Sequence, residues 1–215
     1  MSTTGTLLPV AAVFAVGDWL AVHYRFFRVE YVLKPATLVA LVVAAAGADL
    51  GDAKPWVVTA LVFGLLGDVG LMLSSGRTDR PFLAGLAAFL IGHLFYQVAF
   101  VVAGVHALES LAGLLIVGGA AGLALPEVLR GARQRAGLEF SYIVGAYAAV
   151  LAVMAVLAVG TSHIATAVGG VLFLVSDTLI ARDRFVAPVR HGKLLVIVTY
   201  HLTQFLILIG LIGSF

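Results

Sequence analysis

Three aspartates lie inside long apolar stretches of this chain, and they are the residues best placed to do chemistry. Asp18, Asp68 and Asp177 each fall in a segment long and apolar enough to cross a bilayer. An ionised carboxylate is costly in hydrocarbon, so one that is kept there faces a bundle interior or a watery cavity, where it pairs, binds a ligand or transfers protons. We therefore expect a buried polar site suited to acid and base chemistry.

The composition identifies the solvent around these carboxyl groups. Of the 215 residues, 62% are hydrophobic and 11% are charged, with a mean hydropathy of +1.11. Soluble domains are about half apolar and about a quarter charged. The chain is thus predicted to be an integral membrane protein without a role in nucleic-acid binding. It has no cysteine, which excludes disulfides and cysteine-ligated metals.

The apolar stretches and the polar breaks between them predict an all-α fold, a polytopic bundle of eight transmembrane helices in a single domain covering residues 1–215. Lys34 and Pro35 are expected to open the second span, and Ser74, Ser75 and Gly76 to end the third. The predicted spans lie near residues 5–23, 33–48, 55–74, 82–104, 107–125, 138–159, 164–181 and 194–213.

Charge in the connecting loops predicts the orientation, because Lys and Arg concentrate on the cytoplasmic side of a membrane protein. Twelve of the thirteen Lys and Arg residues lie in the loops after the first, third, fifth and seventh spans or beside them, whereas only Lys54 lies in the others. This places those four loops in the cytoplasm and both termini on the non-cytoplasmic side.

The aspartates are predicted to lie at one depth. Asp18, Asp68, Asp177 and Tyr200 each lie five to seven residues inside the basic boundary, which is about 8 to 11 Å at a rise of 1.5 Å per residue. His93 lies deeper, and the outer half is nearly bare of polar residues. This pattern favours a one-sided pocket near the inner leaflet over a pore that crosses the membrane.

Helical spacing groups further residues with the aspartates, since positions three or four apart share a face. The polar ones are His93, Tyr96 and Gln97 in the fourth span, and Lys193, Tyr200, His201 and Gln204 in the eighth. Gly64 lies one turn before Asp68, and Gly170 lies two turns before Asp177. We expect these glycines to let a neighbouring helix or a lipid chain approach the carboxyl groups.

Each of these residues also has a structural interpretation. For Asp68 and Asp177 it is an interhelical hydrogen bond or an ion pair with a histidine or Lys34, although the cost of a charge in the bilayer favours a functional role. Asp18 could reach interfacial water. Lys34 is expected to snorkel and to mark topology. His93, His201, Gln97 and Gln204 are all of types that join helices by hydrogen bonds.

Several short motifs, taken in order, resemble those of the YhhN family of lysoplasmalogenases, which are eight-helix membrane hydrolases that cleave the vinyl ether bond of lysoplasmalogens. The first span and residues 105–138 match only in hydrophobic character. The matching residues are Lys34 and Pro35; Gly67 and Asp68 in LLGDVGLML; Phe82, Gly85, Phe89, His93 and Tyr96; Phe173, Ser176, Asp177, Ala181, Arg184 and Phe185; and Thr199, Tyr200 and Gln204.

The resemblance implies hydrolysis to a fatty aldehyde and glycerophosphocholine or glycerophosphoethanolamine, and the two carboxyl groups suit that chemistry. A vinyl ether hydrolyses by protonation of its β-carbon, and water then attacks the resulting oxocarbenium ion. As in glycoside hydrolysis, one carboxyl group can supply the proton while the other stabilises the cation or activates water. Two such groups close together in a low dielectric tend to share one proton. We therefore assign catalysis to Asp68 and Asp177, with the two roles left open between them.

The remaining predicted site residues position the substrate. The residues expected to position water, the ether oxygen or other parts of the substrate are His93, Tyr96, Tyr200, Gln204, Lys34 and Ser176. The substrate would be a lysophospholipid whose tail lies among the helices, with no metal, cofactor or protein partner implied. Its phosphate would meet basic residues at the cytoplasmic rim, namely Arg77, Arg80, Arg182, Arg184 and Lys193. Of these, Arg184 and Lys193 are the predicted headgroup contacts. A role in setting the membrane topology explains each of these charges equally well.

Two other functions fit parts of the sequence. A zinc-dependent lipid hydrolase of the alkaline ceramidase type would need three protein ligands, which His93, His201 and one aspartate could supply. A small proton-coupled transporter would show internal repeats and broken helices, and neither is clear. The abundance of Ala, Val, Gly and Arg indicates a bacterial source and hence a plasma membrane.

Overall fold

The computed structural model describes residues 3–74 and 80–213, and this part of the chain forms eight α-helices. All eight are long and apolar enough to cross a membrane, which confirms the predicted fold class. A short 3₁₀ turn at Gly51–Ala53 precedes the third helix. The helices are α1 (Thr3–His23), α2 (Phe27–Gly47), α3 (Lys54–Leu73), α4 (Arg80–Ala103), α5 (Ala107–Ala136), α6 (Leu138–Gly160), α7 (Ile164–Phe185) and α8 (Gly192–Ile212).

Two helices extend well beyond their predicted spans. Helix α2 begins at Phe27, so Lys34 and Pro35 lie inside it and not at its start. Helix α5 continues past residue 125 through Pro126 to Ala136. In both cases the extra turns carry charged residues, so the apolar stretch is shorter than the helix. Polar turns of this kind suit the interfacial region on either side of the hydrocarbon core.

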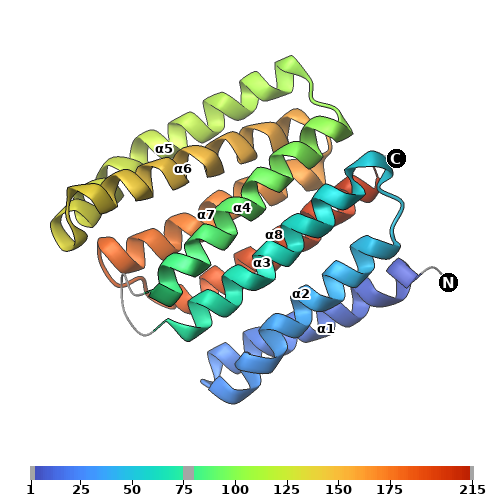
Figure 1. Cartoon of the computed structure of the whole chain (residues 1–215), viewed down its shortest axis with the longest axis horizontal. Coiled ribbons are helices and arrows are strands. Elements are labelled where there is room, and N and C mark those ends of the chain that lie inside the picture. Colours follow the sequence, from blue (N-terminus) through green and yellow to red (C-terminus); the bar gives the residue numbers. More distant parts are fainter. Residues whose placement is uncertain (1–2, 75–79, 214–215) are drawn as a thin grey trace.

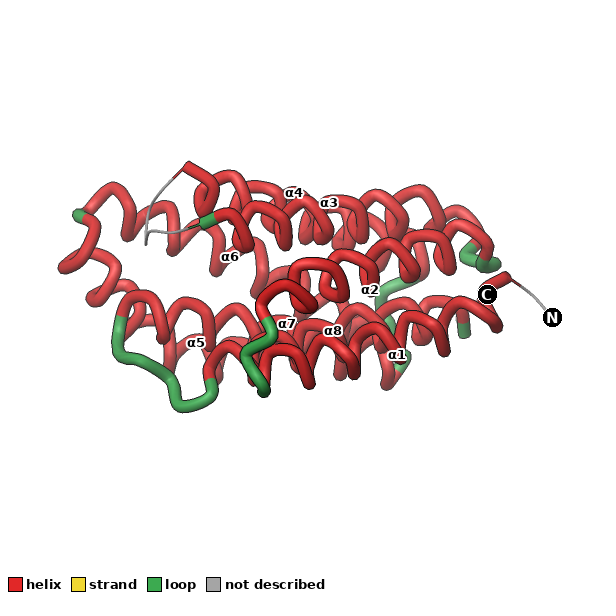
Figure 2. Tube along the Cα trace, turned by 90° about the horizontal axis from the view of Figure 1, so that it is seen from below, coloured by secondary structure: helices red, strands yellow, loops and turns green. Residues whose placement is uncertain are grey.

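Consecutive helices pack side by side as four hairpins, α1 with α2, α3 with α4, α5 with α6, and α7 with α8 (Figure 1). The α1–α2 hairpin packs on α3 and α8, while α6 packs on both α4 and α7. Both termini lie at one end of the bundle, together with the loops after α2, α4 and α6 (Figure 1). Seen from below, the described chain is helical almost throughout, with short loops (Figure 2).

At the opposite end of the bundle α1, α3, α5 and α7 end, and we call it the basic end. It holds the Arg residues expected there from the sequence, including Arg25, Arg130 and Arg190. Its assignment to the cytoplasm stays a prediction. Asp68 lies five residues before the end of α3 and Asp177 eight before the end of α7, which is about 8 and 12 Å along the helices. The two carboxyl groups therefore lie at similar depths.

Glycines bring α3 and α4 into close contact beside Asp68. A Cβ atom on Gly70 would come within 2.6 Å of the Gly85 Cα, and one on Gly67 would come equally close to the Phe89 ring. Only glycine allows this approach, because any larger side chain would force the helices apart. The contact fixes the segment of α3 that carries Asp68 against α4.

Candidate active site

Asp68 forms an ion pair deep in the bundle. Its Oδ1 atom lies 2.9 Å from the Lys34 Nζ atom of α2, and the two side chains are 1% and 13% exposed. Lys34 therefore points inward, so its interpretation as a snorkelling residue is wrong. The ion pair expected as the structural alternative for Asp68 is present. The Lys34 ammonium group favours the ionised form of this carboxyl group.

Polar side chains from α4 and α8 meet close to Asp68. The Tyr96 hydroxyl donates a hydrogen bond to the Gln204 Oε1 atom. A Cβ atom on Gly64 would lie 3.1 Å from the Tyr200 hydroxyl oxygen and 3.3 Å from the Gln204 Nε2 atom, so this glycine makes room for both groups. The Tyr200 hydroxyl interacts electrostatically with Asp68. Two side chains of α8 thus fill the space over Gly64, and the approach of a lipid chain to the carboxyl group there stays a prediction.

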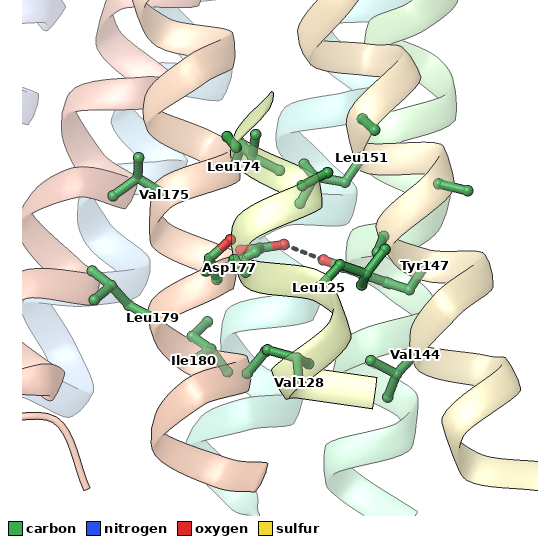
Figure 3. A pocket seen from close by; sticks show the side chains of 18 of the residues that line it. Leu125, Val128, Val144, Tyr147, Leu151, Leu174, Val175, Asp177, Leu179 and Ile180 are labelled. Carbon is green, nitrogen blue, oxygen red and sulfur yellow. Dashed lines mark hydrogen bonds between the residues drawn. The ribbon is translucent and has the colours of Figure 1, made fainter. Parts of the chain in front are cut away.

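Asp177 has different partners. The Tyr147 hydroxyl of α6 donates a hydrogen bond to the Asp177 Oδ2 atom (Figure 3). The His93 Nε2 atom lies 4.0 Å from the same oxygen, which is beyond hydrogen-bonding distance. The His93 ring meets the rings of Tyr147 and Phe173 edge-on at centroid distances of 5.4 and 4.6 Å. Within residues 3–74 and 80–213, neither ring nitrogen of His93 has a hydrogen-bond partner.

Asp177 and Tyr147 lie on the wall of an apolar cavity of about 370 Å³ between α4, α5, α6 and α7. Figure 3 shows them among apolar side chains such as Leu125, Val144 and Leu174. The cavity reaches the outer surface between α5 and α7, since the lining residues Ile116 and Val175 are 53% and 41% exposed. An apolar cavity with a few converging polar groups is the usual form of a small-molecule site.

Aromatic rings separate the two carboxyl groups. Tyr200 packs edge-on against Phe89 and Phe173, at centroid distances of 5.7 and 5.8 Å. Phe89 also lines the cavity and covers Gly67, the residue before Asp68. Asp68 pairs with Lys34 and Asp177 with Tyr147, so the expected sharing of one proton between the two aspartates is not the arrangement found.

Other predicted site residues hold the bundle together. The Ser176 hydroxyl is buried and donates to the Val196 carbonyl of α8. Gln97 donates to the Val150 carbonyl of α6, as expected for a residue that joins helices. Trp19 donates to the His201 Nδ1 atom at 3.2 Å. These contacts link helices and leave any role in positioning substrate as a prediction.

The basic residues proposed to meet a headgroup divide between two sides of the bundle. Arg184 lies 3.5 Å above the centre of the Phe82 ring and donates to the Ser74 hydroxyl. Because Phe82 lines the cavity, Arg184 stands at its basic end. Lys193 pairs with Glu30 at 2.7 Å, beside α2, and lies apart from the cavity lining. Arg182 pairs with Glu127 at 2.9 Å, Arg80 is exposed, and Arg77 lies outside the described residues.

Sequence reasoning missed Tyr147. It lies nine residues from the start of α6, a depth close to that of Asp177, so the argument from depth would have found it had tyrosines of the sixth span been included. Asp18 is fully buried, so the interpretation in which it reaches interfacial water is wrong and its expected place inside the bundle is confirmed.

The histidines do not form a metal site with an aspartate. In the part of the chain that the structure describes, no group of three His, Cys, Asp or Glu residues could hold a metal ion. His201 pairs with Trp19 of α1, whereas His93 packs against Tyr147 of α6. The three-ligand set required by the zinc alternative is therefore not assembled among these residues.

Comparison with known proteins places this geometry in a family. The sequence profile of the YhhN family matches residues 29–211. The chain belongs to the YhhN family. The matched region of this YhhN protein includes Lys34, Asp68, Tyr147 and Asp177, but it leaves the whole of α1, with Asp18, outside.

Curated relatives of this YhhN protein are named lysoplasmalogenases. It is 32% identical to lysoplasmalogenase TMEM86A of Bos taurus over 166 residues, which covers 72% of this chain and 64% of the relative. It is 29% identical to human TMEM86A over the same shares, and 33% identical to human lysoplasmalogenase TMEM86B over 72% of this chain and 62% of that protein. The chain thus spans less than two thirds of these relatives. No solved structure matches it.

Proposed function

We propose that this chain is a lysoplasmalogenase that hydrolyses the vinyl ether bond of lysoplasmalogens to a fatty aldehyde and glycerophosphocholine or glycerophosphoethanolamine. The observation that carries the proposal is the pair of Asp177 and Tyr147 on the wall of an apolar cavity inside a membrane bundle. The names of the curated relatives support the same activity.

The cavity suits a lipid with a single chain. Its lining is apolar apart from a few groups, and it reaches the lipid-facing surface between α5 and α7. An alkenyl chain would enter there directly from the bilayer. Arg184 stands at the basic end of the cavity, where a guanidinium group would pair with the phosphate of the headgroup. The vinyl ether would then lie between the tail and the headgroup, beside Asp177.

Asp177 is proposed as the general acid. Its surroundings are apolar, and no cation lies within hydrogen-bonding distance of it among the residues described. Burial of that kind favours the neutral acid over the carboxylate. Tyr147 donates to Oδ2, which orients the carboxyl group and leaves Oδ1 to carry the proton. Transfer of that proton to the β-carbon gives the oxocarbenium ion.

Asp68 is proposed as the base, because its ion pair with Lys34 favours the carboxylate. Water adds to the oxocarbenium carbon, and its proton passes through the Tyr200 hydroxyl to Asp68. The resulting hemiacetal collapses to the aldehyde and the alcohol, with the hydroxyl proton moving to the leaving oxygen. Tyr96 and Gln204 would hold Tyr200 and the water in place. Phe89 and Phe173 would face the cation, which aromatic rings stabilise.

The decisive experiment measures aldehyde release from a lysoplasmalogen by the purified protein in detergent. A saturated-ether analogue and the Asp177→Asn variant serve as controls. Release that requires both the vinyl ether and Asp177 would support the proposal. A folded protein that releases no aldehyde, or that moves solutes across proteoliposomes without lipid turnover, would contradict it.

The proposed location is the plasma membrane of a bacterial cell, with the basic end in the cytoplasm. The residue usage and the concentration of Arg and Lys at that end support this placement. Under this orientation the headgroup of the substrate would come from the cytoplasmic leaflet. Labelling of single cysteines introduced into the loops after α1 and α2 would test the orientation, since only one of the two should react from outside the cell.

A further inference from the structure

Asp18 is the most unusual buried group that the reaction above leaves unused. Its side chain is fully buried, and neither carboxyl oxygen has a hydrogen-bond partner within the described ranges. A buried carboxyl group with no partner is costly as an anion. The residue lies on α1, before the segment that the family profile covers.

The charged groups that face Asp18 come from every helix beside it. They are Glu30 and Lys34 from α2, Asp68 from α3 and Lys193 from α8, and among these charges Lys34 interacts most strongly with Asp18. Lys34 is also the ion-pair partner of Asp68. One buried ammonium group therefore serves two buried carboxyl groups. Since each uncompensated buried charge is expensive, the cluster is most stable with one carboxylate and one protonated acid.

A line of ionisable groups leads from this cluster to the basic end. Glu30 lies one helical turn from Lys34 on α2, so the two share a face. Its Oε2 atom is 2.7 Å from the Lys193 Nζ atom, and Lys193 is 60% exposed. Two ion pairs, Asp68 with Lys34 and Glu30 with Lys193, thus lie one helical turn apart between buried Asp68 and water.

We propose that Asp18 is the proton-release residue for Asp68. At rest Asp18 holds a proton and Asp68 is the carboxylate paired with Lys34. When Asp68 takes up the proton of the attacking water, Lys34 loses its counter-ion, so Asp18 releases its own proton along Glu30 to solvent and becomes the carboxylate. Return of the Asp68 proton to Asp18 restores the resting state, and Asp177 regains one from solvent. The number of protons is unchanged over a turnover. This role rests on the proposed function.

The test separates the first turnover from later ones. An asparagine has the neutral charge of the protonated acid but cannot release a proton, so Asp18→Asn should leave the first turnover near the wild-type rate. Later turnovers should slow roughly tenfold or more, because proton transfer by a positioned group contributes effects of that order. Rapid mixing with a lysoplasmalogen should therefore show a burst of one aldehyde per protein. Asp18→Glu should restore much of the steady rate.

The matched control is Asp52→Asn, which changes an exposed aspartate in the connection between α2 and α3 and should have no burst. Equal steady-state rates and pH profiles in Asp18→Asn and the wild type would overturn the inference. Loss of the first turnover as well would also overturn it, since Asp18 would then be needed before any proton is released.

Infrared spectroscopy tests the resting proton without any substrate. The wild type should show carbonyl bands from two protonated buried carboxyl groups, Asp177 and Asp18. One of these bands should be missing from Asp18→Asn, and both should be present in Asp52→Asn. Absence of the Asp18 band from the wild type at neutral pH would overturn the inference even if lysoplasmalogen is hydrolysed. A wild type that shows the Asp18 band but releases no aldehyde would instead overturn the proposed function, and the release role with it.

Discussion

Asp177 and Asp68 are two carboxyl groups at similar depths in one bundle, and their surroundings differ in kind. Asp177 faces an apolar cavity and accepts a hydrogen bond from Tyr147. Asp68 is buried behind aromatic rings and pairs with Lys34. The same side chain is thus held in a setting that favours the acid in one place and the carboxylate in the other. Environment, and not residue type, divides the two proposed roles.

The strongest test of this division is Asp177→Asn. An asparagine keeps the shape and can accept from Tyr147, but it has no proton of suitable acidity to give. We expect aldehyde release to fall by about 100-fold or more, as is typical when a general acid is removed. Unfolding in detergent should change little. Asp49→Asn, at an exposed site, should behave as wild type. Normal turnover by Asp177→Asn would mean that Asp177 is not the general acid.

The second test breaks the ion pair. Lys34→Met leaves the Asp68 carboxylate buried without a partner, and loss of one member of a buried pair costs about 3 to 5 kcal/mol. We expect thermal unfolding of this variant in detergent to occur at a clearly lower temperature, together with loss of activity.

The double variant Lys34→Met with Asp68→Asn sharpens the result. It removes both charges, so it should recover most of the stability while remaining inactive. If the double variant were no more stable than Lys34→Met, the buried charge would not be the cause. If it were active, Asp68 would not be the base.

The third test concerns the hydrogen bond that orients the acid. Tyr147→Phe keeps the ring beside His93 and removes the donor to Asp177. A hydrogen bond of this kind contributes about 0.5 to 1.5 kcal/mol, so we expect kcat to fall about two- to twelvefold with little change in KM. Tyr142→Phe, at a position 69% exposed, is the matched control. Equal kcat values for the two variants would mean that Tyr147 does not orient the acid.

Much of this arrangement could be predicted from the sequence, because the bilayer constrains it strongly. Long apolar stretches gave the eight helices, and the cost of buried charge pointed to Asp68 and Asp177. The ends of α2 and α5 were misplaced because apolar composition marks the hydrocarbon core, whereas a helix can continue into the interface.

The pairing of the site residues could not be predicted in the same way. Depth places residues along a helix, but the partner of each depends on which face turns toward which neighbour. Lys34 was expected to point toward the interface and instead points to Asp68. Tyr147 carries no charge, so the cost of burying a charge did not point to it. Asp18 differs from an interfacial aspartate only by the helices that cover it.

The last test asks whether the cavity beside Asp177 selects the chain of the substrate. Ala124 of α5 lines it, and a leucine there would fill part of the space opposite α7. We expect Ala124→Leu to raise KM a few-fold for long alkenyl chains and less for short ones, since each methylene group excluded from apolar surroundings loses about 0.8 kcal/mol of binding. Ala112→Leu, on an exposed part of the same helix, should leave the preference unchanged. If both variants kept the wild-type preference for chain length, the tail would lie elsewhere and the contrast between an apolar substrate site at Asp177 and a polar cluster at Asp68 would lose its functional meaning.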